Sequence, residues 1–235
     1  MSKRKQQLAD QLQERFGHML NQIDAQKDCV TVQITPANLL EVSHVLRDTE
    51  PFKFDQLIDI CGVDFSEYGV TEWRTSETST SGYSRAVEPN ETDHYLKWHK
   101  SRFASVVHLL SVANNQRMRI HVYLDSKAPV LPTLTGIWAS ANWFEREAFD
   151  LFGIVYEGHP DLRRILTDYG FVGHPFRKDF PLIGEVELRY DATLQRCVYE
   201  PVSIQPRTTV PKVIRDDNRY LHSEVLTKSA NKEGV

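Results

Sequence analysis

The sequence predicts an α+β fold: helices packed on one side of a mixed β-sheet, then a short helical segment, then an extended C-terminal arm. Three observations support this prediction. Apolar residues at helical spacing begin the chain, several later stretches alternate apolar with polar residues, and prolines recur after residue 200. A helix, a strand, a helix and then several strands form the order typical of helices covering a sheet.

The N-terminal part is predicted to hold two helices around one strand. Residues 4–20 place apolar side chains at helical spacing, which predicts an amphipathic helix. Residues 30–34 alternate apolar and polar side chains, as a strand does. Thr35 is a good N-cap and Pro36 suits the first helical position, so we expect a second helix to about Arg47.

Three further strands are expected before residue 140. They span residues 57–65, 103–112 and 118–124, and the last has one apolar face. Asn114-Asn115 suits a hairpin turn between the second and third of these strands. Residues 75–102 are rich in small polar side chains without a period, so we interpret them as a flexible surface loop.

Residues 141–184 are predicted to be a short helical segment. Asn142 and Glu145 have the spacing of a capping box, and the helix is expected to run to Phe152, with Gly153 ending it in the left-handed conformation. Pro160 is expected to start a second short helix, because proline is favoured at a first helical position.

The C-terminal arm, residues 185–235, has no predicted core of its own. Residues 186–190 and 197–199 resemble short strands, and Pro201, Pro206 and Pro211 preclude a helix there. We expect this arm to lie extended on another surface and its polar end to be disordered. The sequence therefore predicts three parts, at residues 1–140, 141–184 and 185–235.

Composition narrows the function classes. The net charge of −4 and pI of about 6.1 do not suggest a global phosphate-binding surface. The sequence has no Gly-x-Gly-x-x-Gly and no Gly-Lys-Ser/Thr phosphate loop, so NAD binding within this chain is unsupported. Three scattered cysteines, no signal-peptide pattern and no membrane-length apolar run predict a chain kept in the bacterial cytoplasm.

Residues 143–180 are dense in aromatic and charged side chains. They hold nine aromatics, five Arg or Lys and seven Asp or Glu. Aromatics and arginine are enriched at interface hot spots, and mixed charges favour paired contacts. The residues that we expect at a subunit interface are Glu145, Arg146, Glu147, Asp150, His159, Asp161, Arg163, Arg164, Asp168, His174, Arg177, Lys178 and Asp179.

The carboxylates, histidines and arginines in this segment could each have a role in catalysis or ligand binding instead of a structural one. The carboxylates of 145–150 could transfer protons, but a solvated or interface helix face with Arg146–Asp150 pairing is favoured. His159 and His174 could bind a metal, but hydrogen bonds that stabilise their turns are favoured. The arginines could bind phosphate or lipid headgroups, but neighbouring acids favour ion pairs between subunits.

Three linked motifs resemble the 30 kDa subunit family of respiratory complex I, the proton-pumping NADH–quinone oxidoreductase. The motifs are Glu145 to Ile154, Gly158 to Leu166 and Gly173 to Pro181. Supporting matches lie outside them, at Asp59–Asp64, Phe103–Ser111 and Tyr199–Ser203. The resemblance covers roughly residues 30–215, and residues 75–102 match the family least well.

The resemblance implies a structural and assembly subunit in the peripheral arm of the complex, on the cytoplasmic side of the inner membrane. It implies as the chief partner the quinone-site subunit that is related to hydrogenase large chains, with iron–sulfur subunits nearby. It also implies no cofactor in this chain, with FMN and the iron–sulfur clusters in partner subunits. Because the chain stops after the arm, it resembles the form not fused to the quinone-site subunit.

Two other functions remain open at this point. The chain could be the equivalent subunit of a related membrane-bound hydrogenase. It could also be a stand-alone enzyme that uses the carboxylates of residues 145–150, which predicts turnover by the isolated chain.

Overall fold

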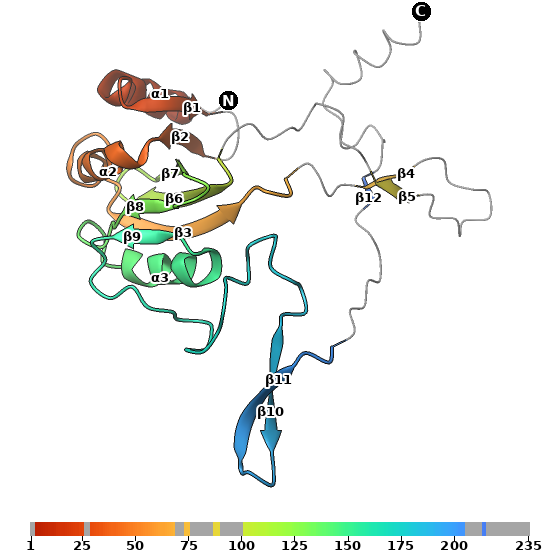
Figure 1. Cartoon of the computed structure of the whole chain (residues 1–235). Coiled ribbons are helices and arrows are strands. Elements are labelled where there is room, and N and C mark those ends of the chain that lie inside the picture. The colour runs from red at the N-terminus through yellow and green to blue at the C-terminus, as the bar shows by residue number, and fades with distance from the viewer. Residues whose placement is uncertain are drawn as a thin grey trace, which may run out of the picture. The chain divides into compact units, whose positions relative to one another are not determined.

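The computed structural model describes residues 3–25, 29–68, 73–75, 87–89, 101–204 and 213–214. The chain forms two compact units, residues 1–66 with 100–202 and residues 67–99 with 203–235. The first unit holds all described helices and the main sheet (Figure 1). The predicted division at residues 140 and 184 stays a prediction.

The first unit contains these helices and strands in chain order: α1 (Lys3–Phe16), β1 (Leu20–Asp24), β2 (Val30–Ile34), the short 3-10 helix η1 (Pro36–Asn38), α2 (Leu39–Asp48), β3 (Gln56–Asp64), β6 (Phe103–Ser111), β7 (Gln116–Leu124), β8 (Val130–Pro132), α3 (Ala141–Phe152), β9 (Val155–Glu157), β10 (Val186–Asp191) and β11 (Arg196–Pro201). The second unit contains β4 (Trp73–Thr75), β5 (Val87–Pro89) and β12 (Val213–Ile214).

The main sheet has five strands in the order β1-β2-β7-β6-β3 (Figure 1). It is mixed, because β2 pairs parallel to β7 while the other pairs are antiparallel. Val32, Ile120, Val107 and Ile60 are consecutive partners across β2, β7, β6 and β3, and all four are buried in one core. That core also contains side chains from α1, α2 and α3, which confirms the predicted α+β fold with helices on one side.

A glycine lets α3 approach this buried face. Gly62 lies two residues after Ile60 in β3, so it points to the same side. A Cβ at Gly62 would lie 2.5 Å from the Phe152 ring, at the end of α3. The absence of a side chain at Gly62 therefore sets the distance between α3 and the sheet.

The N-terminal predictions need two corrections. The first helix ends at Phe16, not near residue 20, and Leu20 begins β1, which pairs with β2. This strand was missed because Leu20 extends the apolar spacing of the helix. Thr35 makes no side-chain cap, and Pro36 begins η1, so α2 itself starts at Leu39.

The segment predicted to be a loop, residues 75–102, contains a strand. β5 lies within it and pairs with β4, which in turn pairs with β12 in a three-stranded sheet. The interpretation as a continuous loop is therefore wrong at Val87–Pro89. Most of the remaining segment and nearly all of the polar C-terminal end lie outside the described residues.

Helix α3 forms as predicted, but its N-terminus differs. Ser140 is the N-cap and makes no side-chain cap; its hydroxyl donates to the Leu57 carbonyl at 3.3 Å. The predicted capping box is wrong, because Asn142 lies inside the helix. Gly153 ends the helix with φ of 73°, which confirms the predicted left-handed cap.

Two predictions after α3 have opposite outcomes. The second short helix expected at Pro160 is absent from residues 154–185, which form turns and the strand β9. The two short strands predicted in the arm are present as β10 and β11, which pair with each other. Among the described residues, no helix has the length and apolarity needed to cross a membrane.

Candidate functional site: a buried polar face on helix α3

Helix α3 buries three charged side chains. Glu145 and Asp150 are fully buried and Arg146 is 5% exposed, whereas Glu147 is exposed. Residues 158–180, which we call the wrapping loop, bind the side chains of Arg146 and Asp150 and supply the partners that water would otherwise provide. Of the predicted solvated or interface helix face, the solvated alternative is therefore wrong for Glu145, Arg146 and Asp150, and the interface alternative stays a prediction.

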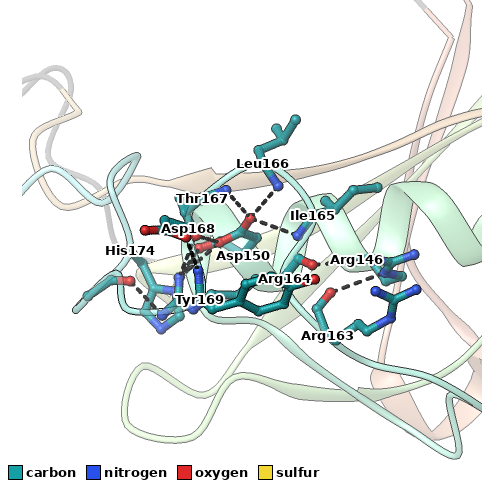
Figure 2. Close-up of polar contacts among 11 residues, drawn as sticks. Arg146, Asp150, Arg163, Arg164, Ile165, Leu166, Thr167, Asp168, Tyr169 and His174 are labelled. Carbon is teal, nitrogen blue, oxygen red and sulfur yellow. Dashed lines mark hydrogen bonds and ion pairs between the residues drawn. The ribbon is translucent and has the colours of Figure 1, made fainter. Parts of the chain in front are cut away.

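Asp150 organises the centre of the wrapping loop (Figure 2). Its carboxylate accepts backbone N–H bonds from Ile165, Leu166 and Thr167 at 3.0, 2.7 and 2.8 Å. It also accepts from the Thr167 hydroxyl and pairs with Arg164 Nη1 at 2.9 Å. Burial alone would raise the pKa of Asp150, but the hydrogen bonds from residues 165–167 outweigh it and hold this pKa well below its usual range.

Arg146 of α3 and Arg164 of the wrapping loop both bind carbonyl oxygens of this loop (Figure 2). Arg146 donates to the carbonyls of Arg163 and Arg164 at 3.1 and 3.3 Å, and Arg164 donates to the Gly173 carbonyl at 2.9 Å. The expected Arg146–Asp150 pair is therefore wrong, since Asp150 pairs with Arg164 instead. Unsatisfied carbonyls of a loop without secondary structure need such donors when they are buried.

The first Gly-His-Pro turn, residues 158–160, is fastened to the start of α3. His159 Nδ1 accepts the N–H of Asp161 at 3.0 Å, so Nε2 carries the ring proton. That proton points to the Asn142 carbonyl at 3.3 Å. The prediction of a turn-stabilising histidine is confirmed here.

The second Gly-His-Pro turn, residues 173–175, is fastened to the end of α3. His174 Nδ1 lies 2.8 Å from the Asp150 carbonyl. Figure 2 shows both residues in the polar cluster. Gly173 has φ of 93°, and Gly158 in the first turn has φ of 80°, so both copies use a glycine in the left-handed region. The repeated tripeptide therefore forms two turns that contact α3, one at each end of the helix. Burial lowers the pKa of His174.

Glu145 binds the segment before α3 rather than the wrapping loop. Its carboxylate accepts from the Thr133 hydroxyl at 2.5 Å and from the Leu134 N–H at 2.6 Å. His159 Nε2 lies 3.9 Å away, and both side chains are fully buried. Burial raises the pKa of Glu145 to about 7, against the lowering effect of the two hydrogen bonds.

The end of the wrapping loop is bound to the main sheet. Asp64 of β3 accepts the Lys178 N–H at 2.9 Å and pairs with Arg102 at 2.7 Å, and Arg102 also pairs with Asp179 at 2.9 Å. Burial would raise the pKa of Asp64, but the bonds from Arg102 and two backbone N–H groups lower it below its usual range. Arg102 was missed, because no motif in its own neighbourhood pointed to it.

Arg177 completes this attachment. Its Nε donates to the Phe152 carbonyl at 2.6 Å, and its guanidinium lies 5.0 Å from the centre of the Phe103 ring. The Phe152 carbonyl is one of the last of α3, so Arg177 satisfies a helix end that has no partner within the helix. Within this chain, Arg177 therefore joins the end of α3 to Phe103 of the main sheet.

The remaining predicted site residues lie on the surface. Glu147, Asp161, Arg163, Asp168, Lys178 and Asp179 are exposed. Asp161 pairs with Arg163 at 2.8 Å, and Asp168 accepts a bond from the Tyr199 hydroxyl in β11. These side chains remain available to a partner, and their contact with one stays a prediction.

Beside the wrapping loop lies an apolar cavity of about 230 Å³. Phe171, Val172 and Phe180 line it together with Val186 and Tyr199 of the arm. The described residues contain no group of three or more His, Cys, Asp or Glu side chains placed to hold a metal ion. The polar groups of this site therefore fix the wrapping loop on α3, and an apolar cavity lies beside that loop.

The chain resembles known proteins over nearly its whole length. Residues 32–186 match the model of the family described as respiratory-chain NADH dehydrogenase, 30 Kd subunit. The C subunit of NADH-quinone oxidoreductase from Coxiella burnetii is 58% identical over 220 residues, covering 94% of this chain and 97% of that protein. The relative of the same name from Legionella pneumophila is 52% identical over 217 residues, covering 92% and 95%.

A solved structure shares the fold. A chain of the membrane-bound sulfane sulfur reductase, an archaeal respiratory membrane complex, superposes with a TM-score of 0.53 at 16% identity. The match covers 76% of this chain and 86% of that chain. At this identity the likeness concerns the fold alone.

Proposed function

Because the chain belongs to the family of the 30 kDa subunit of respiratory-chain NADH dehydrogenase, we propose that it holds subunits of the complex together and carries no catalytic group of its own. As a member of this family it has other subunits of complex I as partners. Its task in this proposal is assembly of the module that reduces quinone.

The observation that carries the proposal is how the charged side chains of α3 and of the wrapping loop are bound. Asp150, Arg146 and Arg164 bind backbone groups of the wrapping loop, and these bonds shape the loop. Groups that take part in proton transfer or nucleophilic attack must reach a substrate. Here Glu145 and Asp150 are enclosed by their own chain, which favours a structural role.

The partners are the finer part of the proposal. The quinone-site subunit related to hydrogenase large chains is the main partner, and the neighbouring iron–sulfur subunits lie nearby. FMN and the iron–sulfur clusters belong to partner subunits. The chain associates peripherally with the cytoplasmic side of the inner membrane through these partners. The basis is the family resemblance, together with the exposed surface of the wrapping loop and arm.

A purification of the tagged chain from gently solubilised membranes tests this proposal. We expect the quinone-site subunit and the iron–sulfur subunits to co-purify with it, and FMN to be present in the preparation. The chain produced alone is expected to be colourless and unable to oxidise NADH. Recovery with hydrogenase subunits, or NADH oxidation by the chain alone, would contradict the proposal.

A further inference from the structure

The hairpin formed by β10 and β11 has one wholly uncharged face. Residues directly opposite each other in an antiparallel pair share a face. The register therefore gathers six side chains on one side of the hairpin, listed here as cross-strand pairs: Val186 with Pro201, Leu188 with Tyr199, and Tyr190 with Cys197. Two aromatic rings, two aliphatic side chains, a proline and a cysteine form this apolar face.

This face is open to solvent in the isolated chain. Val186, Leu188, Tyr190 and Tyr199 are 56%, 57%, 61% and 59% exposed. Among the described strands, β10 and β11 pair with each other and with no third strand (Figure 1). A two-stranded hairpin is at best marginally stable in water, so burial of its apolar face is the natural source of added stability.

The opposite face has the character of a solvent side. Arg189 forms an ion pair with Glu200 across the strands at 2.8 Å, and Asp191 is the cross-strand partner of Arg196. Val198 is the apolar residue among these polar ones, facing Arg189. This contrast between the faces defines which side of the hairpin a partner would cover.

The apolar face continues into the cavity beside the wrapping loop. Val186 and Tyr199 belong to the hairpin face and also line the cavity of about 230 Å³. Phe171 and Phe180 stack at 5.7 Å between ring centres in its wall. A hollow beside an exposed apolar face suits one large apolar side chain of a partner, as pockets at interface hot spots do.

Charge helps to identify the occupant. Asp168 and Glu185 also line the cavity at the base of the apolar face. Residues 185–201 contain four acidic and two basic side chains, so the surroundings of the apolar face carry a net negative charge. The cytoplasmic surface of a membrane is also negative and would repel them. A protein surface that is apolar in its centre and basic at its rim complements both features.

We propose that the apolar face of the hairpin, with the cavity at its base, docks onto another subunit of the complex, which presents an apolar patch bordered by basic residues and inserts one large apolar side chain. The inference rests on the proposed function, because it needs an assembled complex. It assigns the docking to the hairpin rather than to the charged surface of the wrapping loop.

Two matched variants of the full chain test this docking. Leu188→Asp puts a carboxylate on the apolar face, and Val198→Asp puts the same carboxylate on the opposite face of the same hairpin. Both are expressed in place of the native chain, and assembled complex is measured on native gels of solubilised membranes. We expect Leu188→Asp to lower the assembled amount by at least about tenfold, and Val198→Asp to lower it by less than about twofold.

Folding of each isolated variant is followed by circular dichroism, so that loss of assembly is separated from unfolding. Equal assembly of the two variants would overturn the docking inference while leaving the proposed function intact. A wild-type chain that is absent from the complex would overturn the proposed function itself.

A lipid occupant is tested by flotation of the wild-type chain with vesicles of phosphatidylethanolamine and phosphatidylglycerol. We expect the chain to remain unbound at physiological salt. Flotation of the wild type that is lost in Leu188→Asp would assign the face to lipid and overturn the docking to a protein.

Discussion

At the residue scale, the charged side chains of α3 illustrate what a sequence can and cannot reveal. Their density drew attention to residues 143–180, and the hydrogen bond of His159 within its own turn was predicted. The partners of these side chains were not predicted, because Asp150 binds residues 164–167, which lie 14 to 17 residues further along the chain. Spacing within a helix predicts neighbours on that helix, whereas the loop that returns over it is a tertiary event.

Asp150→Asn is expected to lower the free energy of unfolding of the isolated chain by about 2–4 kcal/mol. The amide removes the charge opposite Arg164, and in either orientation its NH₂ group faces a donor, either the N–H groups of residues 165–167 or the Arg164 guanidinium. Urea unfolding at pH 7 measures the change. An unaltered midpoint would contradict the organising role of this carboxylate.

The pH dependence of Asp150 has a definite sign. The pKa of Asp150 is lower in the folded chain than in the unfolded chain. Its contribution to the free energy of unfolding is therefore present above the usual Asp pKa of 3.8 and is lost as the pH falls below that value.

Glu145→Gln is expected to act at higher pH. The pKa of Glu145 is about 7 in the folded chain against 4.5 unfolded, so the wild type loses stability as the pH rises through this window, by up to about 3 kcal/mol. Glutamine can still accept from Leu134 and bind Thr133. Urea unfolding between pH 4.5 and 8 should show a flatter profile for the variant and a gain of about 1–3 kcal/mol at pH 8.

The matched control for this prediction is Glu147→Gln, on the exposed side of the same helix. It should leave the profile unchanged. Identical profiles for wild type and Glu145→Gln would show that burial does not raise the pKa of Glu145.

At the element scale, most helices and strands of the first unit followed from periodicity, and the ends of elements did not. Gly153 was predicted to end α3 because a left-handed residue commonly follows a helix. The structure adds a second constraint, since a Cβ there would lie 2.3 Å from Arg177 and 2.6 Å from His174. Contacts distant in the sequence also explain why no helix forms at Pro160. Backbone groups of residues 163–167 bind side chains of α3 and not each other, as they would in a helix.

Gly153→Ala is therefore expected to destabilise the chain by about 2 kcal/mol or more. The added methyl group needs a strained backbone at φ of 73° and displaces both side chains that fasten the wrapping loop. Gly136→Ala is the matched control, because a Cβ there meets nothing within 4 Å. Thermal unfolding of both variants compares them, and equal melting temperatures would contradict this account of Gly153.

At the scale of the whole molecule, the charged face of α3 and the apolar face of the hairpin differ in what covers them. The charged face of α3 holds the chain's own wrapping loop, and the apolar face of the hairpin is left open. The sequence predicted that the arm needs another surface, since its proline-rich course has no core. It could not show which face of the arm is apolar, because that depends on the register of β10 with β11.

In the proposed function, the buried charges of α3 build structure and do not perform chemistry. The most direct test is the NADH–quinone turnover of membranes carrying Asp150→Asn, divided by the amount of assembled complex measured as bound FMN. We expect fewer assembled complexes but the same turnover per complex, because the carboxylate acts on the folding of this chain. Normal amounts of complex with a reduced turnover per complex would contradict the account.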